Sequence, residues 1–496
     1  PGLPMFGHGQ IEGFTEKYGM EYRRAYWEEE IDRHLVAMHE SRIFPLMKKR
    51  RLFSGSENFV LYDFFAGDQV DENVFAYSNR AGDERALIVY HNKFASTAGW
   101  IRTSTAAATK DDQGLTVLVR KNLDEALSFK ADGRHYYTFR DYSSGMEYIR
   151  HGKELGEKGM YVEMEAYEYH AFLDFREIYD DDFGTWGELC HRLQGRPVRS
   201  LEDEVKQIRY AEIINPFAEL CSMIPGKADM LFDSDTPPAV REEKREFLRR
   251  GFSSFLSALA ERTGYDGAIE GIVDRIFSEV EFVAILADMQ SGEKPESEAI
   301  HFVKSQLYRE GCEFNRLFLM LFLSLHRISE VTDPEGPLSV SALICHEFGF
   351  ERTIERTIHA CMEYNPPVES PWGSATGVLL LGVLLTHQSL FSGRDEKDLP
   401  QQVKTLFNDK KVQQFLLVHW SNGSEWFNKE RFEYLTWWLY VTDMISCCNE
   451  ALDESCSDGV SPADTRWLWA FCSKRKQPIT ELIYSAHCYE QGYRIP

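Results

Sequence analysis

The sequence predicts a multidomain α+β chain in which a strand, loop and helix are followed by an antiparallel β-sandwich and then by an all-α domain. Three observations indicate this order. A short apolar run at the amino end passes into a glycine-rich turn and then into helical periodicity. Residues 56–180 show the two-residue alternation of strands. Later residues show helical spacing. We therefore expect domains at residues 1–55, 56–180 and 181–496.

The opening unit begins with an apolar run at residues 3–6, which passes into a turn rich in glycine at residues 7–13. A buried parallel strand ends in such a loop at the carboxyl edge of a sheet. A lone parallel strand cannot satisfy its backbone hydrogen bonds, and no other strand and helix alternate downstream. Because the numbering also starts at Pro1 and not at Met, we expect this unit to close a sheet or barrel that is encoded upstream.

A helix is expected next, from about residue 23 to residue 51. Its apolar residues recur mostly at three- and four-residue spacing, which places Trp27 on the apolar face and predicts that its indole belongs to the core. Pro45 either kinks this helix or restarts it, because proline lacks one backbone donor. The basic run at residues 48–51 lies at the helix end, where the helix dipole stabilises cations, and we interpret it in that way.

Two segments of this opening unit resemble a known family. Residues 2–10 (GLPMFGHGQ) are similar to the segment around the eighth barrel strand of the α-amylase family, glycoside hydrolase family 13. Residues 23–27 (RRAYW) resemble the Arg-x-(Ala/Pro)-x-Trp signature that follows this strand in the family. The resemblance implies that residues 1–55 are the last βα unit of a truncated (β/α)8 barrel.

The resemblance also implies where the chemistry lies. Retaining glycosidases need two carboxyl groups about 5 Å apart, and in this family these follow barrel strands upstream of the matching segment. We therefore expect no catalytic residue in this chain. The expected substrate-binding residues are Arg23, which matches a family arginine that contacts sugar, and Gln10 at the loop tip. The alternatives are that Gln10 and His8 stabilise the turn and that Arg23 is a surface or ion-paired residue.

Residues 56–180 carry short runs rich in aromatic and β-branched residues, with turn residues and no long helix between them. This pattern predicts an antiparallel β-sandwich, and the family resemblance implies a β-domain at the same position. The expected strands are residues 58–64, 74–77, 86–90, 115–119, 136–139 and 160–173. In the last of these, Val162 and Met164 alternate with Tyr161 and Glu163, as in a half-buried strand.

Two features of this region have competing interpretations. Trp100, Tyr136 and Tyr142 are candidates for stacking on sugar rings, although strand aromatics more often belong to the core. The acidic run at residues 180–182 offers oxygen ligands that suit calcium. We interpret this run instead as a solvated linker between domains.

The spacing after residue 181 is helical, it is interrupted by Pro and Gly, and no fixed repeat length emerges, which predicts an irregular bundle. The expected helices are residues 201–210, 241–260, 269–287, 298–308, 313–327, 352–364, 401–420 and 431–450. The apolar runs at residues 317–325 and 378–385 are much shorter than the roughly 20 residues that span a bilayer. We interpret them as core helices, and the histidines nearby, such as His326 and His387, as core or helix-end residues.

Composition narrows the possible functions. The 496 residues include 79 acidic and 55 basic side chains, a formal net charge of −24, which disfavours nucleic acid as a partner. Ten scattered cysteines contain no CxxC pair, so we expect reduced thiols in a cytoplasmic protein. A metal site at Cys345, His346, His359 and Cys361 is disfavoured because their spacing fits no structural zinc pattern. The sequence contains no phosphate loop and no nucleophile elbow, so we expect no cofactor. The spacing of the cysteines and histidines leads us to expect no metal, and the short apolar runs lead us to expect no membrane contact.

The sequence thus favours the carboxyl-terminal part of an α-amylase-like glycoside hydrolase that acts on an α-glucan or oligosaccharide. Under this hypothesis the whole enzyme cleaves or transfers α-glucosidic bonds with retention, and this chain alone is inactive. The alternative is a non-catalytic carbohydrate-binding or protein-interaction protein whose helical region binds a partner.

Overall fold

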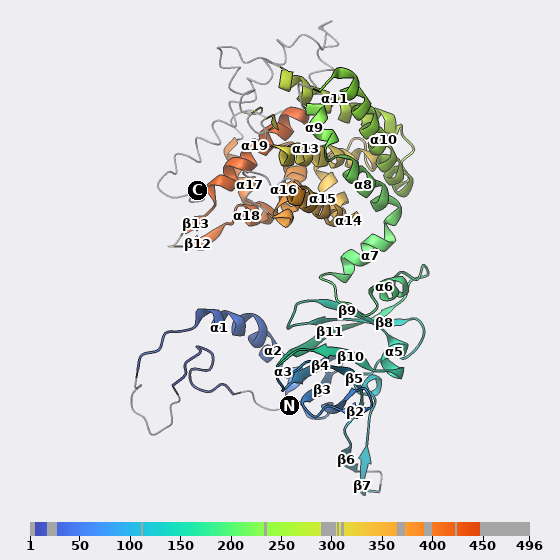
Figure 1. Cartoon of the computed structure of the whole chain (residues 1–496), viewed down its shortest axis with the longest axis vertical. Coiled ribbons are helices and arrows are strands. Elements are labelled where there is room, and N and C mark those ends of the chain that lie inside the picture. Colours follow the sequence, from blue (N-terminus) through green and yellow to red (C-terminus); the bar gives the residue numbers. More distant parts are fainter. Residues whose placement is uncertain are drawn as a thin grey trace. The chain divides into compact units, whose positions relative to one another are not determined.

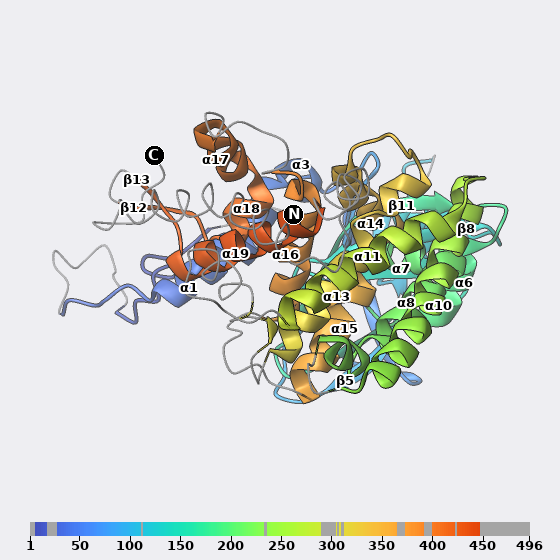
Figure 2. The ribbon, with the colours of Figure 1, turned by 90° about the horizontal axis from the view of Figure 1, so that it is seen from above.

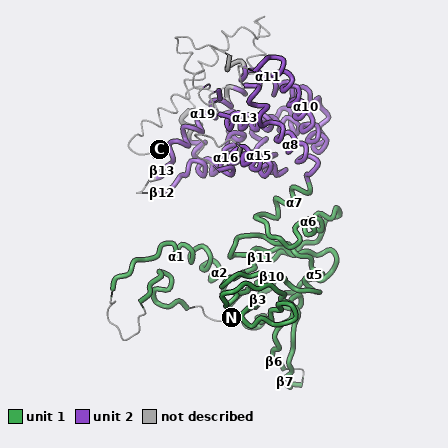
Figure 3. Tube along the Cα trace, viewed as in Figure 1, with its two compact units in different colours: residues 1–209 green, residues 210–496 purple. Residues whose placement is uncertain are grey.

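A computed structural model of the chain describes residues 5–16, 27–110, 113–232, 236–288, 304, 307–308, 312–364, 373–390, 399–421 and 424–446. The chain forms two compact units, residues 1–209 and 210–496 (Figures 1 and 3). We refer to them as the β-unit and the helical unit. The division into three domains at residues 55 and 180 stays a prediction.

The opening segment differs from the expected strand and helix. Met5 and Phe6 are not in a strand, and Met5 is exposed, while residues 3 and 4 lie outside the described residues. The described residues 5–16 form turns, closed by bonds such as that from the Phe14 amide to the Gly9 carbonyl at 2.8 Å. The assignment of residues 1–55 to a barrel therefore remains a prediction.

The first helix begins later than expected. Helix α1 spans Arg33–Met38, and the Asp32 side chain caps it by accepting from the amides of His34 and Leu35. A π-helical turn at His39–Ile43 leads to α2 (Phe44–Lys48), which has Pro45 in its first turn, and then to α3 (Arg50–Phe53). Pro45 thus restarts the helix, one of the two expected outcomes.

The prediction that Trp27 belongs to the core is wrong. Its side chain is 57% exposed. Trp27 lies outside the helix, which begins at Arg33, so helical periodicity cannot place its indole on a buried face.

The β-unit contains one nine-stranded sheet. Its strands are β1 (Val60–Ala66), β2 (Gln69–Val70), β3 (Val74–Ala81), β4 (Glu84–His91), β5 (Thr97–Ser104), β8 (His135–Asp141), β9 (Glu147–His151), β10 (Met160–Met164) and β11 (Tyr169–Tyr179). Every pairing in it is antiparallel, in the order β10-β5-β1-β3-β4-β11-β8-β9, with β2 beside β1. The antiparallel prediction is confirmed.

The arrangement as a two-layer sandwich is wrong, because the strands form one continuous curled sheet around a single core. Met160 and Val162 of the edge strand β10 share that core with Phe139 of β8, and Tyr148 of the opposite edge strand β9 packs against it. Helices α4 (Leu123–Leu127) and α5 (Gly152–Glu157) contribute Leu123, Leu127 and Leu155 to the same core. A sheet whose two edge strands pack on one core must curl toward closure.

The expected strand at residues 160–173 is divided into two. Strand β10 ends at Met164, the chain turns through residues 165–168, and Tyr167 adopts a positive φ of 56° before β11 begins. The amide of Glu165 donates to the Glu168 carboxylate at 2.7 Å and helps to close this turn. Within β10 the predicted alternation is confirmed, since Val162 and Met164 are buried while Tyr161 and Glu163 are exposed.

The remaining elements of the β-unit are a ribbon and two helices. Strands β6 (Ala107–Lys110) and β7 (Thr116–Val119) form a separate two-stranded ribbon (Figure 1). Helices α6 (Thr185–Leu193) and α7 (Leu201–Arg209) pack against Ile149 of β9 through Leu189, Leu193, Leu201 and Val205. These helices close the β-unit next to its edge strand β9.

Asp180 and Asp181 of the acidic run at residues 180–182 cap α6. Buried Asp180 accepts from the amides of Trp186 at 2.9 Å and Gly187 at 3.1 Å, and Asp181 accepts from the amide of Thr185 at 3.0 Å. Carboxylates at a helix N-terminus satisfy free amides and favour the helix dipole. The interpretation of Asp180 as part of a solvated linker is therefore wrong.

The helical unit is a bundle of helices with irregular lengths (Figures 1 and 2). The described helices are α8 (Ala211–Met223), α9 (Lys227–Phe232), α10 (Pro238–Thr263), α11 (Ile269–Asp288), α13 (Glu313–Leu325), α14 (Ser341–Phe348), α15 (Glu351–Tyr364), α16 (Ser374–His387), α17 (Leu399–Asn408), α18 (Lys410–Phe415) and α19 (Lys429–Ser446). Short 3-10 turns lie at Ile328–Val331 (η2) and Leu338–Val340 (η3). The predicted helical carboxyl region is confirmed; most of the helix expected at residues 298–308 lies outside the described residues.

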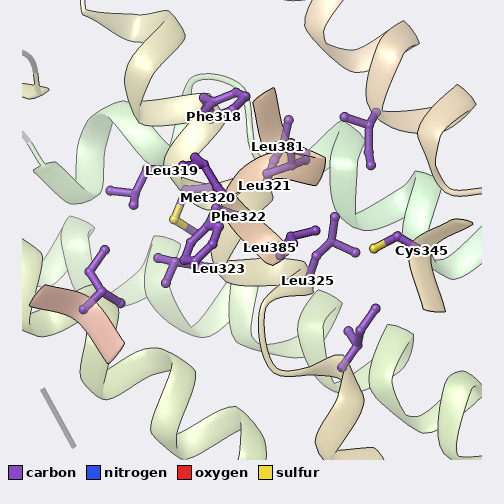
Figure 4. Packing of buried hydrophobic residues seen from close by; sticks show 14 of the residues in the cluster. Phe318, Leu319, Met320, Leu321, Phe322, Leu323, Leu325, Cys345, Leu381 and Leu385 are labelled. Carbon is purple, nitrogen blue, oxygen red and sulfur yellow. The ribbon is translucent and has the colours of Figure 1, made fainter. Parts of the chain in front are cut away.

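Helix α13 is the centre of this bundle. All its residues from Leu317 to Leu325 are buried, and they pack beside Leu381 and Leu385 of α16 and near Cys345 of α14 (Figure 4). A helix that is apolar all round is stable in water only when neighbours cover every face. Both apolar runs at residues 317–325 and 378–385 are core helices, as predicted.

The single helix expected at residues 401–420 is wrong. Asp409 ends α17 and caps α18 by accepting from the Lys411 amide at 2.7 Å. The chain then enters a small hairpin of β12 (His419–Ser421) and β13 (Ser424–Trp426). Leu417 has a φ of 55°, which α-helical backbone does not adopt and which ends the helical run.

Candidate functional site

Of the two predicted sugar-binding residues, only Gln10 lies within the described residues. Gln10 is exposed. Its side-chain Oε1 accepts a hydrogen bond from the backbone amide of Gly7 at 2.9 Å, and its backbone amide donates to the Gly7 carbonyl at 3.2 Å. These bonds close the turn, as in the alternative interpretation. Arg23 lies outside the described residues. Sugar contact by either residue stays a prediction.

The β-unit contains a groove of about 690 Å³ beside the free edge of β10, and we call it the edge groove. Its walls include Trp100 of β5, residues 160–163 of β10, Tyr148 to Arg150 of β9, and residues 194–197 after α6. Phe139, His170 and Phe172 contribute from β8 and β11, and Glu154 and Cys190 from the helices. The volume lies within the range that holds small ligands.

The curl of the sheet produces this groove. Among the described strands, β10 pairs with β5 alone, and β9 pairs with β8 while its residue Glu147 also bridges Val198. The two edge strands do not join, so the side of β10 that lacks a partner faces the opening. Four consecutive residues of β10 line the groove for this reason.

Aromatic rings form much of the groove wall. Trp100 and Tyr161 are cross-strand partners whose ring centroids lie 5.2 Å apart, and Tyr161 is 40% exposed. Across the groove, Tyr148 stacks parallel to Phe139 with centroids 5.4 Å apart. Such rings present flat apolar faces to a ligand beside the hydroxyl group of tyrosine.

Only one of the three aromatic residues singled out in the sequence lies in the groove. Trp100 lines it and is half-buried. Tyr136 is buried against α6, and Tyr142 donates its hydroxyl hydrogen to Asp174 at 2.6 Å. The sequence did not indicate Tyr148 and Tyr161 as a group because 13 positions and different strands separate them.

His170, which lines the groove, pairs with the buried Asp141. His170 Nδ1 lies 2.9 Å from the carboxylate of Asp141, which also accepts from the amides of Ser143 and Ala171 and from the hydroxyls of Ser143 and Ser144. His170 Nε2 lies 3.3 Å from the Glu163 carbonyl on the free edge of β10. The pair thus connects β8 and β11 to the groove edge.

Burial and hydrogen bonding shift the pKa of each member of this pair in opposite directions. Burial raises the pKa of Asp141, but the bonds from His170 and Ser143 outweigh it and hold that pKa far below its usual range. Burial lowers the pKa of His170, whereas the hydrogen bond and charge of Asp141 raise it, and the net direction is upward. A protonated His170 beside an ionised Asp141 is favoured.

Arg150 contributes a cation to the groove wall. Its guanidinium carbon lies 5.5 Å from the ring centre of Tyr148, and its Nη1 donates to the Ile149 carbonyl at 2.9 Å. Gly195, with a φ of 83°, faces the guanidinium so closely that an added Cβ would lie 3.3 Å from Cζ and Nη2. Glycine at this position lets the loop pass directly over the guanidinium.

The helical unit contains a separate buried ion cluster. The Glu279 carboxylate of α11 accepts from Arg327 Nε at 2.9 Å, and its other oxygen lies 2.8 Å from His326 Nε2. Arg327 also donates to Glu330 at 2.5 Å, and Glu330 is further bonded to Arg275. The prediction that His326 is a core residue is confirmed, since it is fully buried: its Nε2 is paired, and its Nδ1 has no hydrogen-bond partner among the described residues. We assign this cluster to stability because its charges pair with one another.

Across the described ranges, no three or more His, Cys, Asp or Glu side chains gather in a way that could hold a metal ion. None of the helices described here has both the length and the apolar character needed to cross a bilayer. The five described cysteines, Cys190, Cys221, Cys312, Cys345 and Cys361, are all free thiols.

Comparison of the chain with protein-family models, curated proteins and solved structures finds no match. The edge groove is therefore interpreted from its own residues.

Proposed function

We propose that this chain is the carboxyl-terminal part of an α-amylase-like glycoside hydrolase and that its β-unit binds an α-glucan or oligosaccharide in the edge groove. The observation that carries the binding role is the aromatic wall of the groove, formed by Trp100, Tyr161 and Tyr148. The two sequence motifs at residues 2–10 and 23–27 support the family assignment.

The chemistry of the groove suits a saccharide. A pyranose ring presents a face of C–H groups, which packs on an aromatic ring, and a rim of hydroxyl groups, which need hydrogen-bond partners. The exposed ring of Tyr161 and the half-buried ring of Trp100 supply the apolar face. Glu163 and His170 line the same groove and supply polar partners.

The proposed role is binding and not bond cleavage. The two acids that line the groove are Glu154, which lies 3.6 Å from Lys158, and Glu163, which is exposed on the edge of β10. Neither is held in the desolvated setting that tunes a glycosidase acid. Under this proposal the chain alone releases no reducing sugar from starch, the whole enzyme supplies the carboxylates, and the protein is cytoplasmic.

Replacing Trp100 by alanine is expected to weaken the binding of maltoheptaose about tenfold, because loss of one stacking face costs about 1–1.5 kcal/mol. The measurement is isothermal titration calorimetry on the purified chain. Tyr161→Ala is expected to have a similar effect, since both rings form one wall.

The matched control is Phe94→Ala. Phe94 forms another exposed aromatic pair in the β-unit, 6.2 Å from Tyr167 between ring centroids, and it does not line the edge groove. The control should bind maltoheptaose as the unmodified chain does. Absence of binding by the unmodified chain, or equal losses in Trp100→Ala and Phe94→Ala, contradicts the proposal.

A further inference from the structure

The edge groove contains an arginine, Arg150, that forms no ion pair with any described carboxylate. Arg150 has five N–H donors, and the bond to the Ile149 carbonyl uses one nitrogen. Among the residues that the structure describes, no Asp or Glu oxygen lies within 4.0 Å of its guanidinium. Most of its donors are therefore available to a ligand in the groove.

The surroundings of Arg150 hold the guanidinium in place. The ring of Tyr148 lies on one side at 5.5 Å, and the backbone of Gly195 packs against it. Burial lowers the pKa of Arg150, so the wall disfavours the charge more than water does. A fixed, partly desolvated guanidinium loses little side-chain entropy when it binds an oxyanion.

The charges that line the groove favour an anion at this end. Arg196 also lines it, and its guanidinium donates to the carbonyls of Leu193 and Arg192. Of the two acids in the wall, Glu154 acts on Arg150 through its charge without forming an ion pair and also has Lys158 beside it, and Glu163 lies on the opposite strand, β10. The local balance contrasts with the net charge of −24 of the whole chain.

We propose that Arg150 forms an anionic subsite in the edge groove, so that the saccharide it takes carries an oxyanion, either a phosphate ester or a carboxylate. This inference rests on the proposed saccharide binding and specifies its ligand. The planar fork of the guanidinium matches two oxygens of such a group through parallel charge-assisted bonds.

The test compares three ligands of equal length by titration calorimetry: maltoheptaose, maltoheptaose with a phosphate ester at one C6, and maltoheptaose with one glucuronate unit. We expect at least one anionic ligand to bind about tenfold more tightly than the neutral one, the gain typical of charge-assisted bonds. The preferred ligand identifies phosphate or carboxylate as the source of the oxyanion. Arg150→Gln should abolish the preference and leave maltoheptaose binding within about twofold.

The control is Arg102→Gln, because Arg102 is an exposed arginine of β5 that does not line the groove. It should keep the full preference. If Arg150→Gln does not fold, as judged by circular dichroism, Arg150→Lys replaces it. This variant keeps the positive charge and the aliphatic chain but not the planar guanidinium. It should retain less than a third of the preference for the anionic ligand.

The outcomes separate the two proposals. Equal affinity of the unmodified chain for all three ligands overturns the anionic subsite and leaves saccharide binding intact. An undiminished preference in the Arg150 variants also overturns the subsite. Failure of every ligand to bind contradicts both proposals. Competition by inorganic phosphate against the phosphorylated ligand, but not against maltoheptaose, supports the subsite.

Discussion

Replacing Glu279 by alanine is expected to lower the free energy of unfolding of the helical unit by about 3–5 kcal/mol, because it leaves the buried Arg327 guanidinium and the His326 ring without the carboxylate that they share. Glu279 and His326 are 0% exposed and Arg327 is 7% exposed, so water cannot replace the lost carboxylate. Burial raises the pKa of Glu279, but His326 and Arg327 lower it by more than burial raises it. The carboxylate is therefore ionised in the folded unit.

Hydrogen exchange of amides in α11 and α13, read by mass spectrometry, measures this loss in the helical unit alone. Glu281→Ala is the matched control, since Glu281 lies two residues further along α11, is exposed, and lies 3.6 Å from Arg245. Exposed pairs contribute about 0–1 kcal/mol, so the control should change little. Similar losses in both variants would show that the buried cluster does not stabilise the unit as argued.

The cluster also predicts that the stability of the helical unit depends on pH. Because the pKa of Glu279 is lower in the folded than in the unfolded chain, its contribution is present above its ordinary value of 4.5. This contribution is lost as the pH falls through the lower, folded value. The protection factors of α11 amides, which are corrected for the pH dependence of intrinsic exchange, should therefore fall toward acid pH more in the unmodified chain than in Glu279→Ala.

Replacing Asp141 by asparagine is expected to destabilise the β-unit by about 2–4 kcal/mol. Asp141 is 0% exposed, and amides, hydroxyls and His170 all direct donors at its two oxygens. Asparagine offers one oxygen and one NH2 group, so at least one donor would face another donor. Exchange of amides in β8 and β11 reports the loss.

The control for this variant is Asp132→Asn. Asp132 also lies beside a histidine, with its carboxylate 2.7 Å from His135 Nδ1, but its side chain is 55% exposed. Water can replace its contacts, so we expect little change in stability. Equal losses in the two variants would contradict the importance of burial at Asp141.

The pair of Asp141 and His170 should stabilise the β-unit most between about pH 4 and 6.5. The lowered pKa of Asp141 makes its contribution present above its ordinary value of 3.8 and lost as the pH falls through the folded value. The raised pKa of His170 makes its contribution present below its ordinary value of 6.5 and lost as the pH rises through the folded value. Asp141→Asn should flatten this profile.

Local patterns predicted much of the secondary structure. Helices α10, α11, α13 and α15 were expected within a few residues of their bounds because each has an apolar stripe at helical spacing. Strands were expected at residues 74–77 and 86–90, and these residues lie in the hairpin of β3 and β4, where Gly82 adopts a positive φ of 66°. Helix α8 was missed because Pro216 lies inside it and argues locally against a helix.

The candidate site was largely beyond the sequence. Trp100 was singled out as a possible sugar contact, but Arg150, Tyr161 and His170 were not. His170 and Asp141 are 29 positions apart, and Glu279 and His326 are 47 apart. The spacing of apolar residues relates positions only a few residues apart. It does not predict which side chains distant in the sequence come into contact.

By itself, the sequence determined that strands precede helices in this protein, which faces of those elements are apolar, and the two amino-terminal motifs behind the family proposal. The tertiary structure decided that the strands curl into one sheet with unjoined edges, and hence that a groove with aromatic walls and an arginine lies there. The physical reason is that the local spacing of apolar residues predicts which face of an element is buried. Closure of a sheet depends instead on pairing and packing between residues far apart in the chain.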